Sequence, residues 1–137
     1  MPGCYLLAVT QASALDTYSN NWSLFNLVEQ VRLEKFPETL PLEVHSYWKF
    51  APDETNVDFE FRLVLIPQEG DSTFSQPVTL RSSSIRYRIR GSGLPISNPG
   101  DYEIHNEWHS PGDPTWFRSD VFWPLLVERI STAEHQS

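Results

Sequence analysis

Apolar and polar residues alternate along most of the chain, with the period of two that is typical of β-strands. The clearest run is 57–66, in which Val57 and Phe59 alternate with Asp58 and Glu60. Because successive side chains of a strand point to opposite faces, this run predicts one buried and one solvated face. Shorter or less regular runs lie at 5–9, 42–50, 74–80, 85–90, 102–109 and 116–130.

Residues 22–33 fit two patterns. Four apolar residues from Leu24 to Val31 have helical spacing, with Ser23 as an N-cap. Alternate positions from Phe25 to Leu33 fit one strand face instead, if a bulge absorbs Glu29. We predict a strand, because the segments on either side have β character.

Two β-hairpins are predicted from the turn residues. The first spans 84–109 and turns at Ser97-Asn98-Pro99-Gly100, where proline and glycine suit the central positions of a tight turn. The second joins 42–50 to 57–66 through Pro52-Asp53-Glu54.

Seven or eight such strands, with a turn about every ten residues, predict an all-β fold: a single-domain antiparallel β-sandwich over residues 1–130. The alternation supplies two apolar faces that must cover each other. The polar residues 131–137 are expected to form a disordered tail.

Composition narrows the classes of function. The net charge is −8, from 10 Lys and Arg against 18 Asp and Glu, which argues against a nucleic-acid partner. No apolar run is long enough to span a membrane, and no basic segment precedes Arg32, so we expect neither membrane insertion nor export. Cys4 is the only cysteine, which fits a cytoplasmic location. No cofactor-binding motif is present, and no cofactor is predicted.

Three residues form the sharpest candidate for chemistry. His105, Glu107 and His109 occupy alternate positions and would share one face of a strand. Two imidazoles and a carboxylate are a known ligand set for zinc or non-haem iron. The alternative is that they form the wet face of a half-buried strand.

A row of arginines lies on the preceding strand. In the register of the first predicted hairpin, the arginines face acidic and histidine side chains, and such a ladder would neutralise itself. If the row is a docking site instead, Arg88 is its central residue. The residues concerned are Arg86, Arg88 and Arg90, opposite Glu103, His105 and Glu107.

Aromatic residues gather near the C-terminus and could form an exposed patch. They are Trp116, Phe117, Phe122 and Trp123. Aromatic residues are enriched at protein interfaces, and tryptophan also binds sugars. Core packing is the alternative. The last strand is apolar on both faces, so its surplus apolar surface needs a cover.

The segment 15–29, LDTYSNNWSLFNLVE, is followed by a proline-flanked strand and later by Pro99-Gly100-Asp101-Tyr102. These features resemble a family of small uncharacterised bacterial β-sandwich proteins, a domain of unknown function. The chain departs from that pattern in having Thr17-Tyr18-Ser19-Asn20 in place of a compact Thr-Asn pair. The resemblance implies a bacterial or phage cytoplasmic β-sandwich and carries over no activity and no catalytic residues.

Taken together, these features predict a non-enzymatic protein-interaction or assembly module that docks onto a protein partner or self-associates as an oligomer. One alternative is a metal-dependent enzyme that uses His105, Glu107 and His109. Another is a small-ligand or carbohydrate-binding sandwich that uses Trp116 and Trp123.

Overall fold

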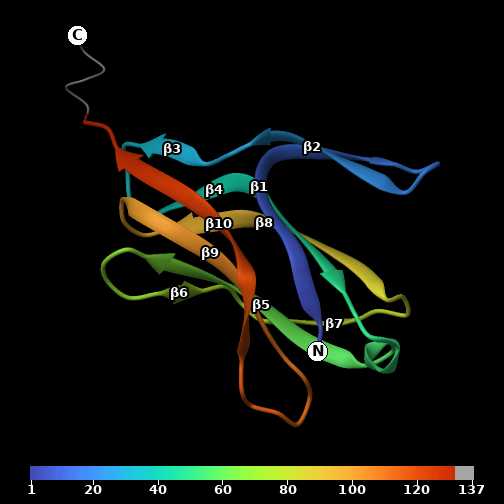
Figure 1. Ribbon diagram of the computed structural model, residues 1–137. Helices are drawn as coiled ribbons and strands as arrows, with labels where there is room; N and C mark the ends of the chain where they lie inside the picture. The colour runs from blue at the N-terminus through green and yellow to red at the C-terminus, as the bar shows by residue number, and fades with distance from the viewer. Residues whose placement is uncertain (132–137) are drawn as a thin grey trace.

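Ten β-strands and one short 3-10 helix, η1 (Pro52–Glu54), make up the part of the chain that the structure describes, residues 1–131 (Figure 1). The structure is a computed structural model. Its strands form two sheets. One has the order β2-β1-β4-β8, and the other has the order β3-β10-β9-β5-β6, with β7 also paired to β5. The bounds of the first sheet are β1 (Gly3–Asp16), β2 (Asn21–Leu27), β4 (Glu38–Lys49) and β8 (Arg86–Ile96). Those of the second are β3 (Gln30–Leu33), β5 (Asp58–Pro67), β6 (Thr73–Phe74), β7 (Val78–Arg81), β9 (Gly100–His109) and β10 (Phe117–Arg129).

The sheets pack through two groups of buried side chains. The larger group joins β1, β4 and β8 of one sheet to β5, β9 and β10 of the other, around Val9, Leu94, Ile104 and Leu125. The second group is aromatic and surrounds Trp48, which is fully buried. Trp48 makes an edge-to-face contact with Phe61, with ring centroids 4.9 Å apart. The predicted all-β sandwich is therefore confirmed.

The number of strands is higher than predicted, because two predicted strands are each divided. Residues 22–33 are strand, as predicted, but the chain passes from the first sheet to the second between β2 and β3. The segment 74–80 contributes to the separate strands β6 and β7. One pair also departs from the antiparallel prediction, since β3 runs parallel to β10.

Both predicted hairpins are wrong in their pairing. β8 pairs with β4 in the four-stranded sheet, whereas β9 pairs with β5 and β10 in the other. Likewise β4 and β5 lie in different sheets. Alternation shows which face of a strand is buried. It does not show whether the next strand pairs with it in the same sheet or packs against it from the other sheet, because both arrangements bury the same face. The turn at 97–99 thus connects the two sheets.

The hairpin of β1 and β2 extends away from the sandwich, at the right of Figure 1. Its turn is held by Asp16, whose carboxylate accepts hydrogen bonds from the Tyr18 amide at 2.9 Å and the Ser19 hydroxyl at 3.0 Å. Asn20 has a φ of 59°, a conformation that asparagine tolerates well. Tyr18 at the tip is fully exposed.

The predicted disordered tail lies outside the described residues, apart from Ser131. Within residues 1–131, no helix has the length and apolar character needed to cross a membrane.

Candidate interaction surface

The predicted metal ligands lie on the outer face of the six-stranded sheet, on β9, as their alternation required. Each has another partner, however. His105 contacts Glu103 at 2.9 Å and the Ser119 carbonyl oxygen at 3.1 Å, and His109 lies 3.4 Å from Glu60. Among the described residues, no three His, Cys, Asp or Glu side chains are grouped in a way that could hold a metal ion. The geometry therefore does not support the metal site.

Glu107, the central member of that set, is a buried carboxylate that pairs with two arginines. One of its oxygens accepts hydrogen bonds from Arg62 Nε at 2.9 Å, and the other accepts from Arg118 Nη2 at 3.0 Å. The Arg62 guanidinium also lies 4.2 Å from the ring of Phe74 and 4.0 Å from that of Trp116. We call these five residues the Glu107 cluster. Through Glu107 on β9, its two arginines connect β9 to β5 and to β10.

The four aromatic residues near the C-terminus do not form one exposed patch. Phe117 and Trp123 face the core: Phe117 stacks on Trp108, and the Trp123 indole N–H donates to the Val28 carbonyl oxygen at 2.8 Å. Phe122 lies on the outer face instead, half exposed and stacked on His105. The period of two along β10 divides the predicted patch between its two faces.

Trp116 lies just before β10. It makes an edge contact with His109, with ring centroids 4.3 Å apart, in addition to its contact with Arg62. Trp116 and Trp123 therefore contact different residues, because Trp116 lies on the outer face and Trp123 packs against the core. They do not form the pair of exposed tryptophans that a sugar-binding platform requires.

The three arginines Arg86, Arg88 and Arg90, which we call the arginine stripe, lie on the outer face of the other sheet. The predicted ladder of opposite charges is wrong, because the strand beside β8 is β4 and not β9. The residues opposite the stripe are Lys49, Tyr47 and His45, in that order. Lys49 adds a fourth cation to this face.

Among the described residues, the side chains of the stripe form no salt bridge, and only Arg90 interacts electrostatically with a carboxylate, that of Glu43. Arg88 lies 5.9 Å from the ring centre of Tyr47, and Arg90 lies 5.3 Å from that of Trp22. Within residues 1–131, none of the three guanidinium groups forms a salt bridge or a side-chain hydrogen bond. Arg86 and Arg90 are exposed, and Arg88 is half buried. The stripe is thus a row of solvated positive charge on a chain of net charge −8.

A small polar group borders the stripe at His45, which makes an edge contact with Trp22. Glu43 accepts hydrogen bonds from the Ser13 hydroxyl at 2.5 Å and contacts His45 Nε2 at 3.0 Å. The Ser13 bond is the main reason that the pKa of Glu43 lies below its usual value, with smaller contributions from His45 and Arg90. Burial lowers the pKa of His45, although Glu43 partly opposes this shift. The bordering carboxylate is therefore already engaged by its own neighbours.

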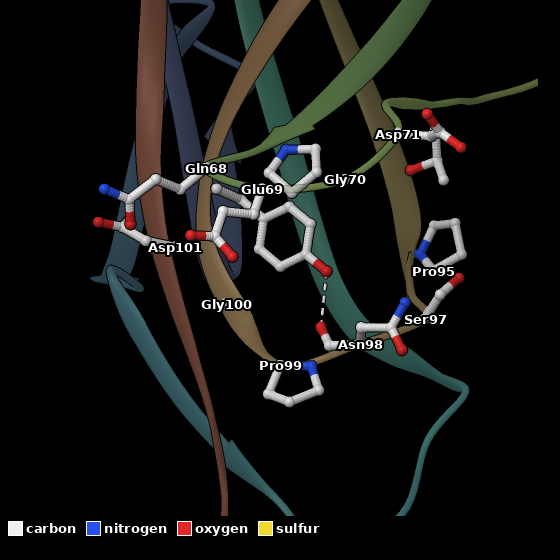
Figure 2. Close-up of a pocket in the computed structure, with 13 residues that line it drawn as sticks. Gln68, Glu69, Gly70, Asp71, Pro95, Ser97, Asn98, Pro99, Gly100 and Asp101 are labelled. Carbon is white, nitrogen blue, oxygen red and sulfur yellow. Dashed lines mark hydrogen bonds between the residues drawn. The ribbon is translucent and has the colours of Figure 1, made fainter.

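A cavity of about 440 Å³ lies where the loop after β5 meets the connection from β8 to β9 (Figure 2). Tyr102 donates a hydrogen bond to the Asn98 carbonyl oxygen at 2.6 Å, drawn as a dashed line in the figure. Glu69, Asp71 and Asp101 also line the cavity. The Tyr102 bond fastens the turn between the sheets, which assigns this region a structural role.

The chain matches no known protein-family model and no curated protein. The resemblance to bacterial β-sandwich proteins therefore stays a prediction.

Sequence reasoning selected Arg88 but missed that the stripe forms no salt bridge within residues 1–131 and that Arg86 and Arg90 are exposed. The signal was present in the alternation of Arg86, Arg88 and Arg90 with apolar residues. We discounted this signal because we assumed that the arginines pair with Glu103, His105 and Glu107, but these residues lie in the other sheet.

Proposed function

We propose that the protein is a non-enzymatic protein-interaction module whose arginine stripe docks an acidic protein partner. The observation that carries the proposal is the row of three arginines that form no salt bridge among the described residues, beside Lys49, on the face of the β4–β8 pair. Arginine is enriched at protein interfaces and pairs with carboxylates through two parallel hydrogen bonds. The neighbouring Tyr47 adds an aromatic surface of the kind found in such interfaces.

The overall charge favours a protein partner over a nucleic acid. Nucleic-acid affinity depends on the number of phosphates neutralised, and the remainder of this chain is strongly acidic. An extended acidic segment of a protein would contact only the stripe, so it would avoid most of the repulsion between its own negative charge and that of the remaining chain. The same acidic surface raises the electrostatic contrast of the stripe, which guides a partner to one location.

The test uses a fluorescent oligo-glutamate peptide, with binding followed by fluorescence anisotropy at low salt. We expect saturable binding that weakens as salt is added, because the contacts are between exposed charges. Arg88→Glu should reduce the affinity by at least about tenfold. Lys35→Glu is the matched control, since it makes the same change of charge at an exposed lysine away from the stripe.

Two outcomes would contradict the proposal. The first is equal loss of affinity in Arg88→Glu and Lys35→Glu, which would show that only net charge matters. The second is tighter binding of a single-stranded oligonucleotide of equal charge, which would assign the stripe to nucleic acid.

A further inference from the structure

The arginine stripe lies on an edge strand. Within residues 1–131, β8 ends the four-stranded sheet, with β4 on one side and no strand of that sheet on the other. An unpaired edge presents main-chain N–H and C=O groups to which another strand can bind. The long register of β8 with β4, from Lys49–Arg86 to Val44–Gly91, keeps this edge regular over six residues.

The register shows which main-chain groups are free. The Phe50 amide donates to the Ile85 carbonyl oxygen at 2.7 Å, and these residues are opposite each other in the same register. In an antiparallel pair, hydrogen-bonded and non-bonded positions alternate. Tyr87 and Ile89 therefore point their main-chain groups toward β4. Arg86, Arg88 and Arg90 point theirs away from β4. Arg88 and Arg90 each offer a side chain and a main-chain pair, whereas the Arg86 N–H already donates to the Ser84 hydroxyl at 3.2 Å.

An apolar groove of about 240 Å³ opens beside the same edge, between the two sheets. Its β8 side includes Ile89 and Gly91, and its other side includes Phe61, Leu63 and Val78. Gly91 is opposite Val44, a core residue, so the inner face of β8 leads into the groove. A strand added to β8 would direct alternate side chains into this space.

We infer that β8 binds an extended polypeptide segment as an added antiparallel strand, with acidic and apolar residues alternating along the segment. The acidic residues lie opposite the arginine stripe, where they meet both the guanidinium and the free main-chain groups. The apolar residues enter the groove between the sheets. This inference rests on the proposed function and specifies how the acidic partner is held.

Charge selects this occupant over a second copy of the chain. Pairing β8 with β8 of another copy would place arginines opposite or beside arginines, and like charges across a ladder are destabilising. Alternating acidic residues instead pair with the stripe along its whole length. The antiparallel direction matches the β4–β8 pair and is the slightly more stable arrangement.

The first test compares peptides of about nine residues, the length of an ordinary strand. One alternates glutamate and valine, and the other has the same composition in two blocks. We expect the alternating peptide to bind at least about tenfold more tightly. N-methylation of its glutamate amides should abolish this advantage, because those amides donate to β8. N-methylation of its valine amides, which point away, should leave it intact.

The second test fills the groove. Gly91→Val adds a side chain where an added Cβ meets no atom within 4 Å, so the sheet itself is undisturbed. This variant should bind the alternating peptide about tenfold more weakly and leave oligo-glutamate binding unchanged. Gly3→Val is the control, because Gly3 also lies in the four-stranded sheet but away from the β8 edge.

The outcomes separate the two proposals. If neither oligo-glutamate nor the alternating peptide binds, the proposed function itself fails. If oligo-glutamate binds but the block peptide equals the alternating one, strand addition is overturned while the docking function stands. Equal effects of the two methylation patterns, or a larger effect at the valine amides, would also overturn the antiparallel register.

Discussion

Both outer faces of this sandwich carry arginines, but among the described residues the arginines form salt bridges on one face and none on the other. On the six-stranded sheet, Arg62 and Arg118 share the buried carboxylate of Glu107, and two aromatic rings enclose Arg62. On the four-stranded sheet, the arginine stripe faces Lys49, Tyr47 and His45. The residue type is the same in both places. The neighbouring strand decides whether an arginine stabilises the fold or remains free to bind.

The two groups of arginines should contribute differently to the stability of the fold. A buried carboxylate that loses its partners leaves an uncompensated charge or a set of unpaired donors, which costs several kcal/mol. An exposed arginine without a partner contributes almost nothing to stability. Substitutions on the two faces should therefore separate stability from binding, and the following experiments test that separation.

The largest effect is expected at the centre of the Glu107 cluster. Glu107→Ala removes the carboxylate that two arginines share and leaves both guanidinium groups close together without an anion. We expect the free energy of unfolding in urea to fall by about 3 kcal/mol. Glu103→Ala, at an exposed carboxylate on the same strand, should cost less than about 1 kcal/mol. Equal losses in the two variants would contradict the central role of Glu107.

A smaller loss is expected from Arg62→Lys. Lysine keeps the positive charge but cannot make the planar contacts with Phe74 and Trp116 or the same pair of bonds to Glu107. The free energy of unfolding should fall by about 1–2 kcal/mol, measured by chemical denaturation. A variant as stable as the original chain would show that charge alone matters at this position.

The arginine stripe should contribute little to folding. Replacing Arg86, Arg88 and Arg90 together with glutamine should lower the free energy of unfolding by no more than about 1 kcal/mol, because no salt bridge is lost and the Arg88–Tyr47 and Arg90–Trp22 contacts are long. Binding of the oligo-glutamate peptide should disappear in the same protein. A large loss of stability would remove the contrast between the two faces.

The smallest effect is expected from the pH dependence of stability, through His45 and Glu43 at the border of the stripe. The pKa of His45 lies below its ordinary value of 6.5 in the folded chain, and that of Glu43 lies below 4.5. Both groups therefore take up protons more readily when unfolded, so stability is lost as pH falls, first through the histidine range and then through the carboxylate range. His45→Gln should flatten the first part of this profile, measured by thermal unfolding. An unchanged slope would contradict the assignment to His45.

The strands themselves were largely predictable. The alternation of Phe59 and Phe61 with polar residues correctly identified β5 and its buried face. The shared face of His105, Glu107 and His109 was also correct. These features depend on the period of the strand, which is a local property of the backbone.

The candidate sites depended on pairings between distant strands and were only partly predictable. Arg88 was identified, but its supposed partners lie in the other sheet. The arginines that pair with Glu107 come from β5 and β10, and no short-range pattern in the sequence connects these strands. The division of Trp116, Phe117, Phe122 and Trp123 between two faces required the direction of β10 relative to the core.

The sequence by itself determined that this chain forms strands and which side of most of them is buried, because alternation acts between neighbouring residues. Only the tertiary structure decided that β8 and β9 enter different sheets. Both arrangements bury the same apolar faces, so the choice depends on the packing of the whole chain. That choice gave Glu107 its two arginines and left the arginine stripe without a salt bridge among the described residues.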